Sequence, residues 1–192
     1  MDTPCRLTRT ACHPTETKRR PNAERGYRKL SGTEGPLFYR PLKPDEAADL
    51  AAFVLKVFTE FVAPQYASEG VAEFKKFIAP DFMAERLAAG NVVWMAVSGS
   101  KTAGVIEMRE NRHIALLFVD ASNQRQGIAR ELIRRAVAVC RERAPDLHTI
   151  TVNASPNAVA AYRQLGFQPA GEEQTVNGIR FIPMARILDG GH

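Results

Sequence analysis

The 192-residue sequence has only three cysteines, and they form no recognisable pattern. Cys5, Cys12 and Cys140 are irregularly spaced and include no Cys-x-x-Cys pair. An odd, scattered set argues against a disulfide scaffold and a structural metal, and it fits a reducing compartment. We therefore expect no metal site. Cys140, which falls within a helical pattern, is expected to pack in the core rather than act as a nucleophile.

Long apolar runs are also missing. None approaches the roughly 18 residues that a membrane-spanning helix requires. The N-terminus lacks the apolar core, about 7–15 residues long, of a secretory signal. We expect a protein without a membrane partner and with a cytoplasmic location.

Net charge is nearly absent from most of the chain, although the total is +5. Residues 1–36 hold eight basic and four acidic residues, so they carry +4 and leave +1 for residues 37–192. The sparse apolar residues of 1–36 predict a disordered basic tail, and 37–192 are expected to form one folded domain. The cluster Lys18-Arg19-Arg20 would suit a nucleic-acid-binding arm, but the tail has almost no aromatic residues for base stacking. A solvated tail is favoured, and a nucleic-acid partner is not expected.

Apolar periodicity and turn residues predict an alternation of strands and helices. Strands are expected at 36–41, 91–97, 103–109, 113–119 and 147–153, and near 168–176 and 179–187, the last two joined by an Asn177-Gly178 turn. Helices are expected at 45–61, from Ser68 onward, and at 81–89, 127–143 and 156–165, with Phe53, Phe58 and Phe61 in the core. This order predicts an α/β fold of the α+β type, with a mixed sheet of about seven strands and helices on both faces.

One segment predicts a binding site. The apolar strand that ends at Val119 is followed by the polar turn 120–126, and a long helix then begins at Gly127. The first N–H groups of that helix have no intrahelical acceptor, and the helix dipole adds partial positive charge. A phosphate or diphosphate suits such a site, and a glycine lets the backbone approach it closely.

The turn before the helix 127–143 has the sequence Gln124-Arg125-Gln126-Gly127-Ile128-Ala129, and about 30 residues later Asn157, Tyr162 and Gly166-Phe167 follow. These two motifs resemble signatures of the GNAT superfamily of acyl-CoA N-acyltransferases. The first fits Gln/Arg-x-x-Gly-x-Gly/Ala, which binds the diphosphate of CoA in that family, and the second fits Asn-x4-Tyr-x3-Gly-Phe. The chain is also similar to bacterial members that have an Ile-Glu-x-Arg strand followed by His-Ile-x-Leu-Leu-Phe-Val.

The resemblance implies the GNAT fold, in which the parallel strands 113–119 and 147–153 splay apart and bind CoA between them. Acetyl-CoA would be the cosubstrate, with no metal. The residues expected to bind it are Phe118, Val119, Gln124, Arg125, Gln126, Gly127, Ile128, Ala129, Asn153, Asn157 and Tyr162. Arg125 and Arg130 are candidates for charge contacts with the phosphates, although either could simply belong to a solvated helix face.

Tyr162 is the main catalytic candidate that the resemblance implies, because its phenol would lie beside the departing thiolate. A thiol with a pKa near ~8.5 and a tyrosine near ~10 make complete proton transfer uphill by about 2 kcal/mol. Hydrogen-bond stabilisation of the thiolate is therefore at least as good an explanation as protonation. A purely structural tyrosine is the alternative.

Two residues are candidates for the base that deprotonates the acceptor amine. Glu107 points away from Ile106 and Met108, and the resemblance implies that its strand lines the acceptor cleft. His113 could act near neutral pH. Either residue could instead be structural. A base is needed mainly for a lysine-like amine near ~10.4, whose deprotonation at pH 7 costs about 4.6 kcal/mol, compared with about 1 kcal/mol for an α-amine near ~7.8.

These expectations together predict an N-acetyltransferase that acts on a primary amine of a small or amino-acid-like molecule by direct attack. The amide near Val119 would polarise the acetyl carbonyl. Acetylation of a protein N-terminal or lysine amine remains open, as does a CoA-binding regulator without turnover. A monomer or a homodimer is expected.

Overall fold

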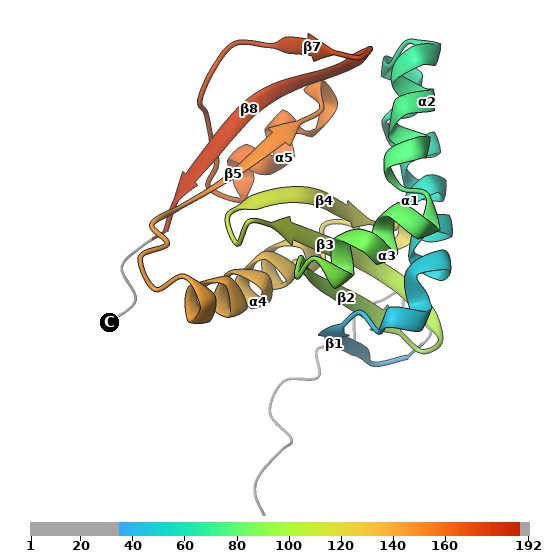
Figure 1. Ribbon diagram of the computed structural model, residues 1–192, viewed down its shortest axis with the longest axis vertical. Coiled ribbons are helices and arrows are strands. Elements are labelled where there is room, and N and C mark those ends of the chain that lie inside the picture. Colours follow the sequence, from blue (N-terminus) through green and yellow to red (C-terminus); the bar gives the residue numbers. More distant parts are fainter. Residues whose placement is uncertain (1–34, 189–192) are drawn as a thin grey trace, which may run out of the picture.

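The computed structural model describes residues 35–188, which form one mixed sheet with helices on both faces (Figure 1). The strands are β1 (Leu37–Pro41), β2 (Val92–Ser98), β3 (Lys101–Arg109), β4 (His113–Val119), β5 (Thr149–Ala154), β6 (Gln168–Pro169), β7 (Gln174–Val176) and β8 (Ile179–Ile187). The helices are α1 (Ala47–Phe61), α2 (Ser68–Phe77), α3 (Pro80–Ala88), α4 (Ile128–Arg143) and α5 (Val159–Gln164). Short 3-10 turns are η1 (Pro44–Glu46), η2 (Ala63–Gln65), η3 (Ala121–Asn123) and η4 (Pro156–Ala158). Nearly all of the predicted tail, residues 1–34, lies outside the described residues.

The sheet has eight strands where about seven were predicted, in the order β1-β2-β3-β4-β5-β8-β6 with β7 also paired to β8. The difference arises near 168–176, where one predicted strand is divided into β6 and β7. Pro169 has no N–H with which to continue a ladder, and Gly171 follows it. The predicted Asn177-Gly178 turn is confirmed, with φ values of 50° and 73° that suit a type I′ hairpin.

Two apolar cores form on opposite faces of the sheet, as the helical patterns predicted. On one face, α4 buries Leu132, Ala136 and Cys140 at four-residue steps. On the other face, α1 buries Leu50 and Val54 in the same way. Each large apolar side chain buried in this manner contributes about 1.5–3 kcal/mol. Cys140 is confirmed as a packing residue, because it is fully buried and its burial raises the pKa of the thiol to about 11.

The central feature of the fold is the separation of β4 from β5, which are parallel neighbours. Their pairing is limited to His113 with Thr151 and Ile114 with Val152. Beyond these two pairs the strands diverge, which confirms the predicted splay (Figure 1). The divergence leaves a gap between the carboxyl ends of β4 and β5.

A β-bulge shapes β4 as it enters the gap. Glu107 lies opposite Leu116, whereas Met108 lies opposite Ile114, so Ala115 has no partner on β3. An extra residue reverses the side-chain alternation. Ile114 therefore packs in the core beneath α4, but Leu116 packs in the core beneath α1.

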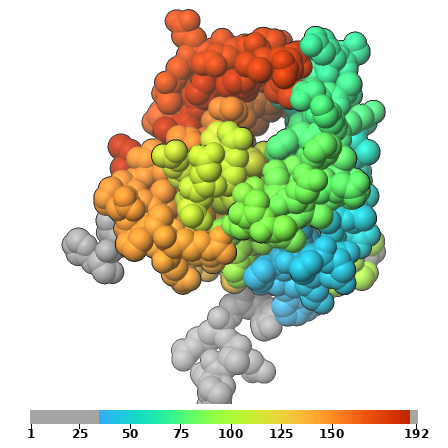
Figure 2. Space-filling view, in the orientation of Figure 1, coloured from blue at the N-terminus to red at the C-terminus, as the bar shows by residue number. Residues whose placement is uncertain are grey.

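Helix α2 reaches across the gap and contacts the β7–β8 hairpin. Gly70 of α2 and Gly178 of the hairpin turn meet through their backbones, and a Cβ on Gly178 would lie 2.6 Å from the Gly70 nitrogen. The space-filling view shows a hollow between α2, the hairpin and β4 (Figure 2). Among residues 35–188, no helix is long and apolar enough to cross a membrane.

Candidate functional site

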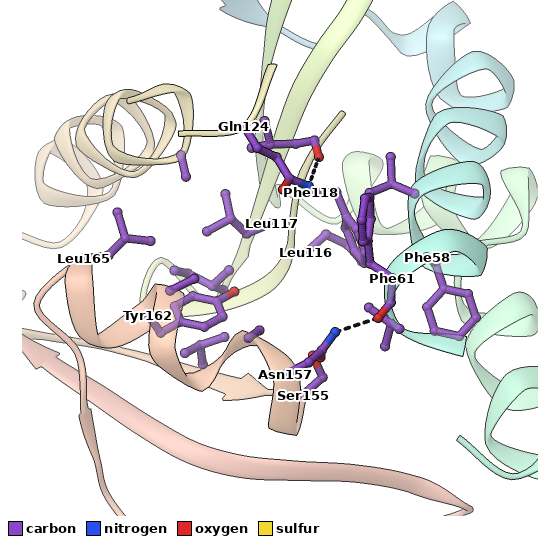
Figure 3. A pocket seen from close by; sticks show the side chains of 18 of the residues that line it. Phe58, Phe61, Leu116, Leu117, Phe118, Gln124, Ser155, Asn157, Tyr162 and Leu165 are labelled. Carbon is purple, nitrogen blue, oxygen red and sulfur yellow. Dashed lines mark hydrogen bonds between the residues drawn. The ribbon is translucent and has the colours of Figure 1, made fainter. Parts of the chain in front are cut away.

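A cavity of about 740 Å³ occupies the gap between β4 and β5. Helix α1, the residues that flank η2, and α2 form one wall, and β4 forms the second. The turn after β4 and the start of α4 form one end, while β5, η4 and α5 complete the lining. Figure 3 shows side chains from α1, β4 and α5 converging on this space.

Two backbone edges face the gap. Asp120 N–H donates to Ala103 O at 3.0 Å, so alternation along β4 turns the backbone groups of Phe118 toward β3 and those of Val119 away from it. On β5, Leu188 N–H donates to His148 O at 2.8 Å, and the same alternation turns the backbone of Asn153 away from β8. The N–H and C=O groups of Val119 and Asn153 thus face the space that separates the two strands. An extended ligand with amide groups could pair with both.

The turn that leads into α4 is shaped for an anion. Gly127 has a φ of 82°, and Arg125 also lies in the left-handed region at 59°. The first hydrogen bond of the helix runs from Glu131 N–H to Gly127 O at 3.1 Å, so the preceding N–H groups have no acceptor within the helix. A Cβ on Gly127 would meet no protein atom within 4 Å. Glycine is therefore required there by the backbone conformation and not by crowding from the protein.

Side chains brace this turn against its neighbours. Gln124 Nε2 donates to Val119 O at 3.3 Å (Figure 3), and Asp120 accepts from the backbone N–H of Ser122 at 3.1 Å. Lys56 of α1 forms an ion pair with Asp120 at 2.7 Å. The turn is thereby connected both to the end of β4 and to the opposite wall.

Most of the predicted cofactor-binding residues line this one cavity. They are Phe118, Val119, Gln124, Arg125, Gly127, Ile128, Ala129, Asn153, Asn157 and Tyr162. Gln126 is the exception, because its side chain turns back toward the loop and its Nε2 donates to Ser122 O at 3.1 Å. Arg130 also lines the cavity, and Arg125 and Arg130 are the charged side chains of its lining among residues 35–188.

Tyr162 lies on α5 with its ring against Phe167, edge to face, at 5.3 Å between centroids. The residue is 8% exposed, and its hydroxyl points into the cavity (Figure 3). Burial raises the pKa of Tyr162, so the phenol stays protonated at neutral pH. Such a group can donate a hydrogen bond, and it is a weaker acid than an exposed tyrosine.

Asn157 of η4 connects the two sides of the cavity. Its Nδ2 donates to Phe61 O at the end of α1, at 2.6 Å, and its Oδ1 accepts from Ser155 Oγ at 2.7 Å (Figure 3). The first of these bonds joins residues 96 positions apart in the chain. Asn157 therefore ties the α1 wall to the β5–α5 side.

Glu107 was expected to line the acceptor cleft, and the structure corrects this placement. Its side chain does point opposite to Ile106 and Met108, but it is 2% exposed and is not among the residues that line the cavity. Arg86 of α3 donates from Nε and Nη2 at 2.7 and 3.0 Å, and Asn91 Nδ2 donates at 2.7 Å. A carboxylate held by three donors anchors α3 to the sheet.

His113 is also outside the cavity lining, although its neighbour Ile114 belongs to it. Its Nδ1 is 2.8 Å from Thr151 Oγ1, across the paired part of β4 and β5. Burial lowers the pKa of His113 to about 4, and Arg109 adds to the effect. The imidazole is therefore neutral at pH 7 and only weakly basic.

The sequence patterns did not identify the wall formed by α1, the residues that flank η2, and α2. Its cavity-lining residues are Val57, Phe58, Phe61, Val62, Tyr66 and Phe74. Phe58 and Phe61 were expected in the core, and Phe58 is indeed fully buried, yet both also line the cavity. Aromatic residues at helical spacing serve a core and a pocket wall equally well, so no sequence signal separates the two roles.

Residues 62–188 match the family described as "Acetyltransferase (GNAT) domain". The match covers about two thirds of the chain, and the protein therefore belongs to the GNAT family of acetyltransferases. The family match agrees with the splayed strands and the αL glycine before α4.

Several relatives and solved structures that are similar to this chain are named N-acetyltransferases. Human N-acetyltransferase 8 is 32% identical over 133 residues, covering 57% of this chain and 56% of its own length. Rat N-acetyltransferase 8F1 is 26% identical over 153 residues, covering 74% and 66% respectively. The chain thus spans roughly half to two thirds of these relatives. A GCN5-related N-acetyltransferase from Rhodopseudomonas palustris superposes with a TM-score of 0.68 at 22% identity, covering 81% of this chain and 98% of its own.

A second solved structure is PaiA N-acetyltransferase from Thermoplasma acidophilum in complex with coenzyme A. It superposes with a TM-score of 0.65 at 13% identity, covering 79% of this chain and 99% of its own. At these low identities, the two structural comparisons establish the fold alone.

Proposed function

We propose that the protein transfers an acetyl group from acetyl-CoA to the primary amine of a small, amino-acid-like molecule. The main support is that the outward backbone edges of Val119 and Asn153, the anion-binding turn and the Tyr162 hydroxyl all face one cavity. An extended amide chain that ends in a diphosphate matches this order of groups.

The donor would be held chiefly by backbone groups. N–H groups from Gln124 to Ala129 would bind the diphosphate, with Arg125 and Arg130 contributing charge. Asn153 and the carbonyl of Val119 would pair with the pantetheine amides, and Phe118 would contribute its side chain. Bound acetyl-CoA supplies an activated acyl thioester. Asn157 would keep the α1 wall in place through its bond to Phe61 O.

The protein would stabilise two negative charges after the neutral amine attacks the thioester carbonyl carbon, one on the carbonyl oxygen and one on the sulfur. Val119 N–H would donate a hydrogen bond to the carbonyl oxygen as negative charge develops there. The C–S bond then breaks with its electron pair on sulfur, and Tyr162 would donate a hydrogen bond to the thiolate. Because burial raises the pKa of Tyr162, complete proton transfer costs more than the ~2 kcal/mol expected for exposed groups, so hydrogen bonding is favoured.

We propose that solvent removes the amine proton. The described lining of the cavity contains no carboxylate, histidine or lysine. Glu107 and His113, the two candidate bases, have the partners described above, and each would need a water chain to reach the cavity. Glu107 acting through water is the remaining alternative for a protein base.

Two other functions compete with this proposal. A protein N-terminal or lysine amine could be the acceptor, and a CoA-binding regulator would have the fold without turnover. The location of Tyr162 at the cavity favours turnover. A cytoplasmic location and a monomeric or homodimeric state stay predictions.

A thiol-release assay with acetyl-CoA over a panel of amines tests the proposal, with Tyr162→Phe run in parallel. We expect amine-dependent release, and a Tyr162→Phe rate about 10–10²-fold lower, the range that corresponds to the loss of one hydrogen bond to a charged group. Acetyl-CoA binding without release for any amine would favour the regulator. Absence of binding would contradict the donor assignment, and equal rates for Tyr162→Phe would remove only the role of the tyrosine.

A further inference from the structure

Given the proposed function, on which this inference rests, we infer that the acceptor is a weakly basic, α-amino-type primary amine attached to an apolar or aromatic body and lacking a second cationic group. The inference rests on the wall formed by α1, the residues that flank η2, and α2. Every side chain that this wall contributes to the cavity is apolar or aromatic. The hydroxyl of Tyr66 is its only side-chain polar atom.

The aromatic residues of the wall form one connected cluster. Phe58 and Phe74 are stacked at 4.0 Å between centroids and 17° between planes. Tyr66 meets Phe58 edge to face at 5.9 Å, and Phe74 meets Phe118 of β4 at 6.0 Å. Rings prefer such offset and edge contacts, so an aromatic or branched apolar group can extend the cluster.

The charges of the cavity exclude a polycation. Its two charged side chains, Arg125 and Arg130, are positive and lie at the diphosphate end. A second ammonium group on the acceptor would lose its hydration beside an apolar wall without gaining a carboxylate partner. A polyamine is therefore a poor fit, whereas a neutral apolar group is a good one.

The absence of a base in the described lining sets the basicity of the amine. At pH 7 about one in seven α-amines near pKa ~7.8 is neutral, compared with about one in 2,500 lysine-like amines near ~10.4. In a site without a base only the neutral amine can attack, so this difference lowers the rate for the more basic amine, although its greater nucleophilicity offsets part of the loss. The α-amine type is therefore favoured.

The hollow beside β4 has a narrow border on one side. Gly70 and Gly178 join α2 to the hairpin through their backbones, and the space-filling view shows the hollow between α2, the hairpin and β4 (Figure 2). An amine on a short apolar body fits this hollow better than an amine on the surface of a folded protein.

Four amines test the inference at pH 7: phenylalaninamide, alaninamide, 2-phenylethylamine and spermidine. We expect kcat/KM for phenylalaninamide to exceed that for alaninamide, which has the same amine type without the ring, at least tenfold. The kcat/KM for phenylalaninamide should also exceed the kcat/KM for 2-phenylethylamine at least tenfold. This ratio should become smaller at pH 9, because the more basic 2-phenylethylamine is then deprotonated to a larger extent. Spermidine should be the poorest acceptor.

Val62→Glu and its control Leu55→Glu test the wall itself. Val62 lines the cavity at the end of α1, whereas Leu55 is 36% exposed on the same helix and is not in the lining. Val62→Glu should raise the spermidine rate relative to phenylalaninamide at least tenfold, and Leu55→Glu should leave the order unchanged. Turnover with spermidine or alaninamide as the best acceptor would overturn the inference and leave the proposed function standing. No release with any amine would overturn both.

Discussion

Glu107→Gln separates a structural carboxylate from a catalytic base. The change removes one charge of a buried ion pair in which Arg86 and Glu107 are 19% and 3% exposed at their side chains. Breaking a buried pair from one side costs about 3–5 kcal/mol, because the remaining charge is left uncompensated. Glutamine retains one acceptor oxygen, so about 3 kcal/mol is expected. For a chain of this size that corresponds to a fall in Tm of about 6–12 °C.

Thermal denaturation gives the stability of Glu107→Gln, and kcat/KM from pH 6 to 9, at a temperature where both proteins are folded, gives its activity. For a structural carboxylate, kcat/KM stays within about threefold of wild type and its pH profile keeps its shape. Loss of a general base would lower kcat/KM about 10²–10⁴-fold. A hundredfold loss with an unchanged Tm would refute the structural assignment.

The double variant Glu107→Leu with Arg86→Leu supplies the matched control. Replacing both partners by apolar groups removes the uncompensated charge, which is often neutral for stability or even favourable. Arg86 also donates to Phe77 O at 2.7 Å and lies 4.0 Å above the Phe77 ring, so recovery of Tm should be partial. Activity should match that of wild type in the double variant, since neither residue lines the cavity.

Three further predictions concern backbone geometry and pH. Gly127→Ala places a Cβ at φ 82°, which should cost about 1–2 kcal/mol, lower Tm by about 2–8 °C and weaken CoA binding in calorimetry. Gly70→Ala should push α2 off the hairpin and raise the acceptor KM more than the acetyl-CoA KM, whereas Gly171→Ala, whose Cβ would meet Pro183 no closer than 3.6 Å, should match wild type. Because the folded pKa of His113 is lowered to about 4 from an ordinary ~6.5, its contribution to stability is present above pH 6.5 and is lost as the pH falls toward 4. Chemical denaturation at pH 7 and 5 should show a smaller acid loss for His113→Gln than for wild type.

The turn between β4 and α4 was predictable because it is encoded locally. A strand, a turn and a helix that follow one another within residues 113–143 fix the N–H groups of the first helical turn, whatever the rest of the chain does. Gly127, Asn177 and Gly178 all have positive φ. Glycine adopts this conformation readily, so its presence in the sequence indicates such turns. The splay of β4 and β5 was predicted only through the family resemblance.

The environment of Glu107 could not be predicted, because its partner comes from a separate element. Arg86 lies 21 residues earlier on α3, and no spacing rule connects a helix residue with a strand residue. Alternation correctly indicated that Glu107 points opposite to Ile106 and Met108, but only packing shows that α3 covers that face. A buried carboxylate and a cleft carboxylate therefore look identical in sequence.

The place of Phe118 in the aromatic cluster depends on a single residue, Ala115, whose effect the sequence does not reveal. The apolar run 113–119 contains neither glycine nor proline, so simple alternation places Ile114, Leu116 and Phe118 on one face. The bulge at Ala115 instead sends Ile114 toward α4 and sends Leu116 and Phe118 toward α1. Without the bulge, Phe118 would leave the aromatic cluster that it joins through Phe74. The aromatic cluster thus follows from register and packing, whereas the turn before α4 follows from local sequence, so under the proposed function substitutions on α1 or α2 are expected to change the acceptor and to leave the turn unchanged.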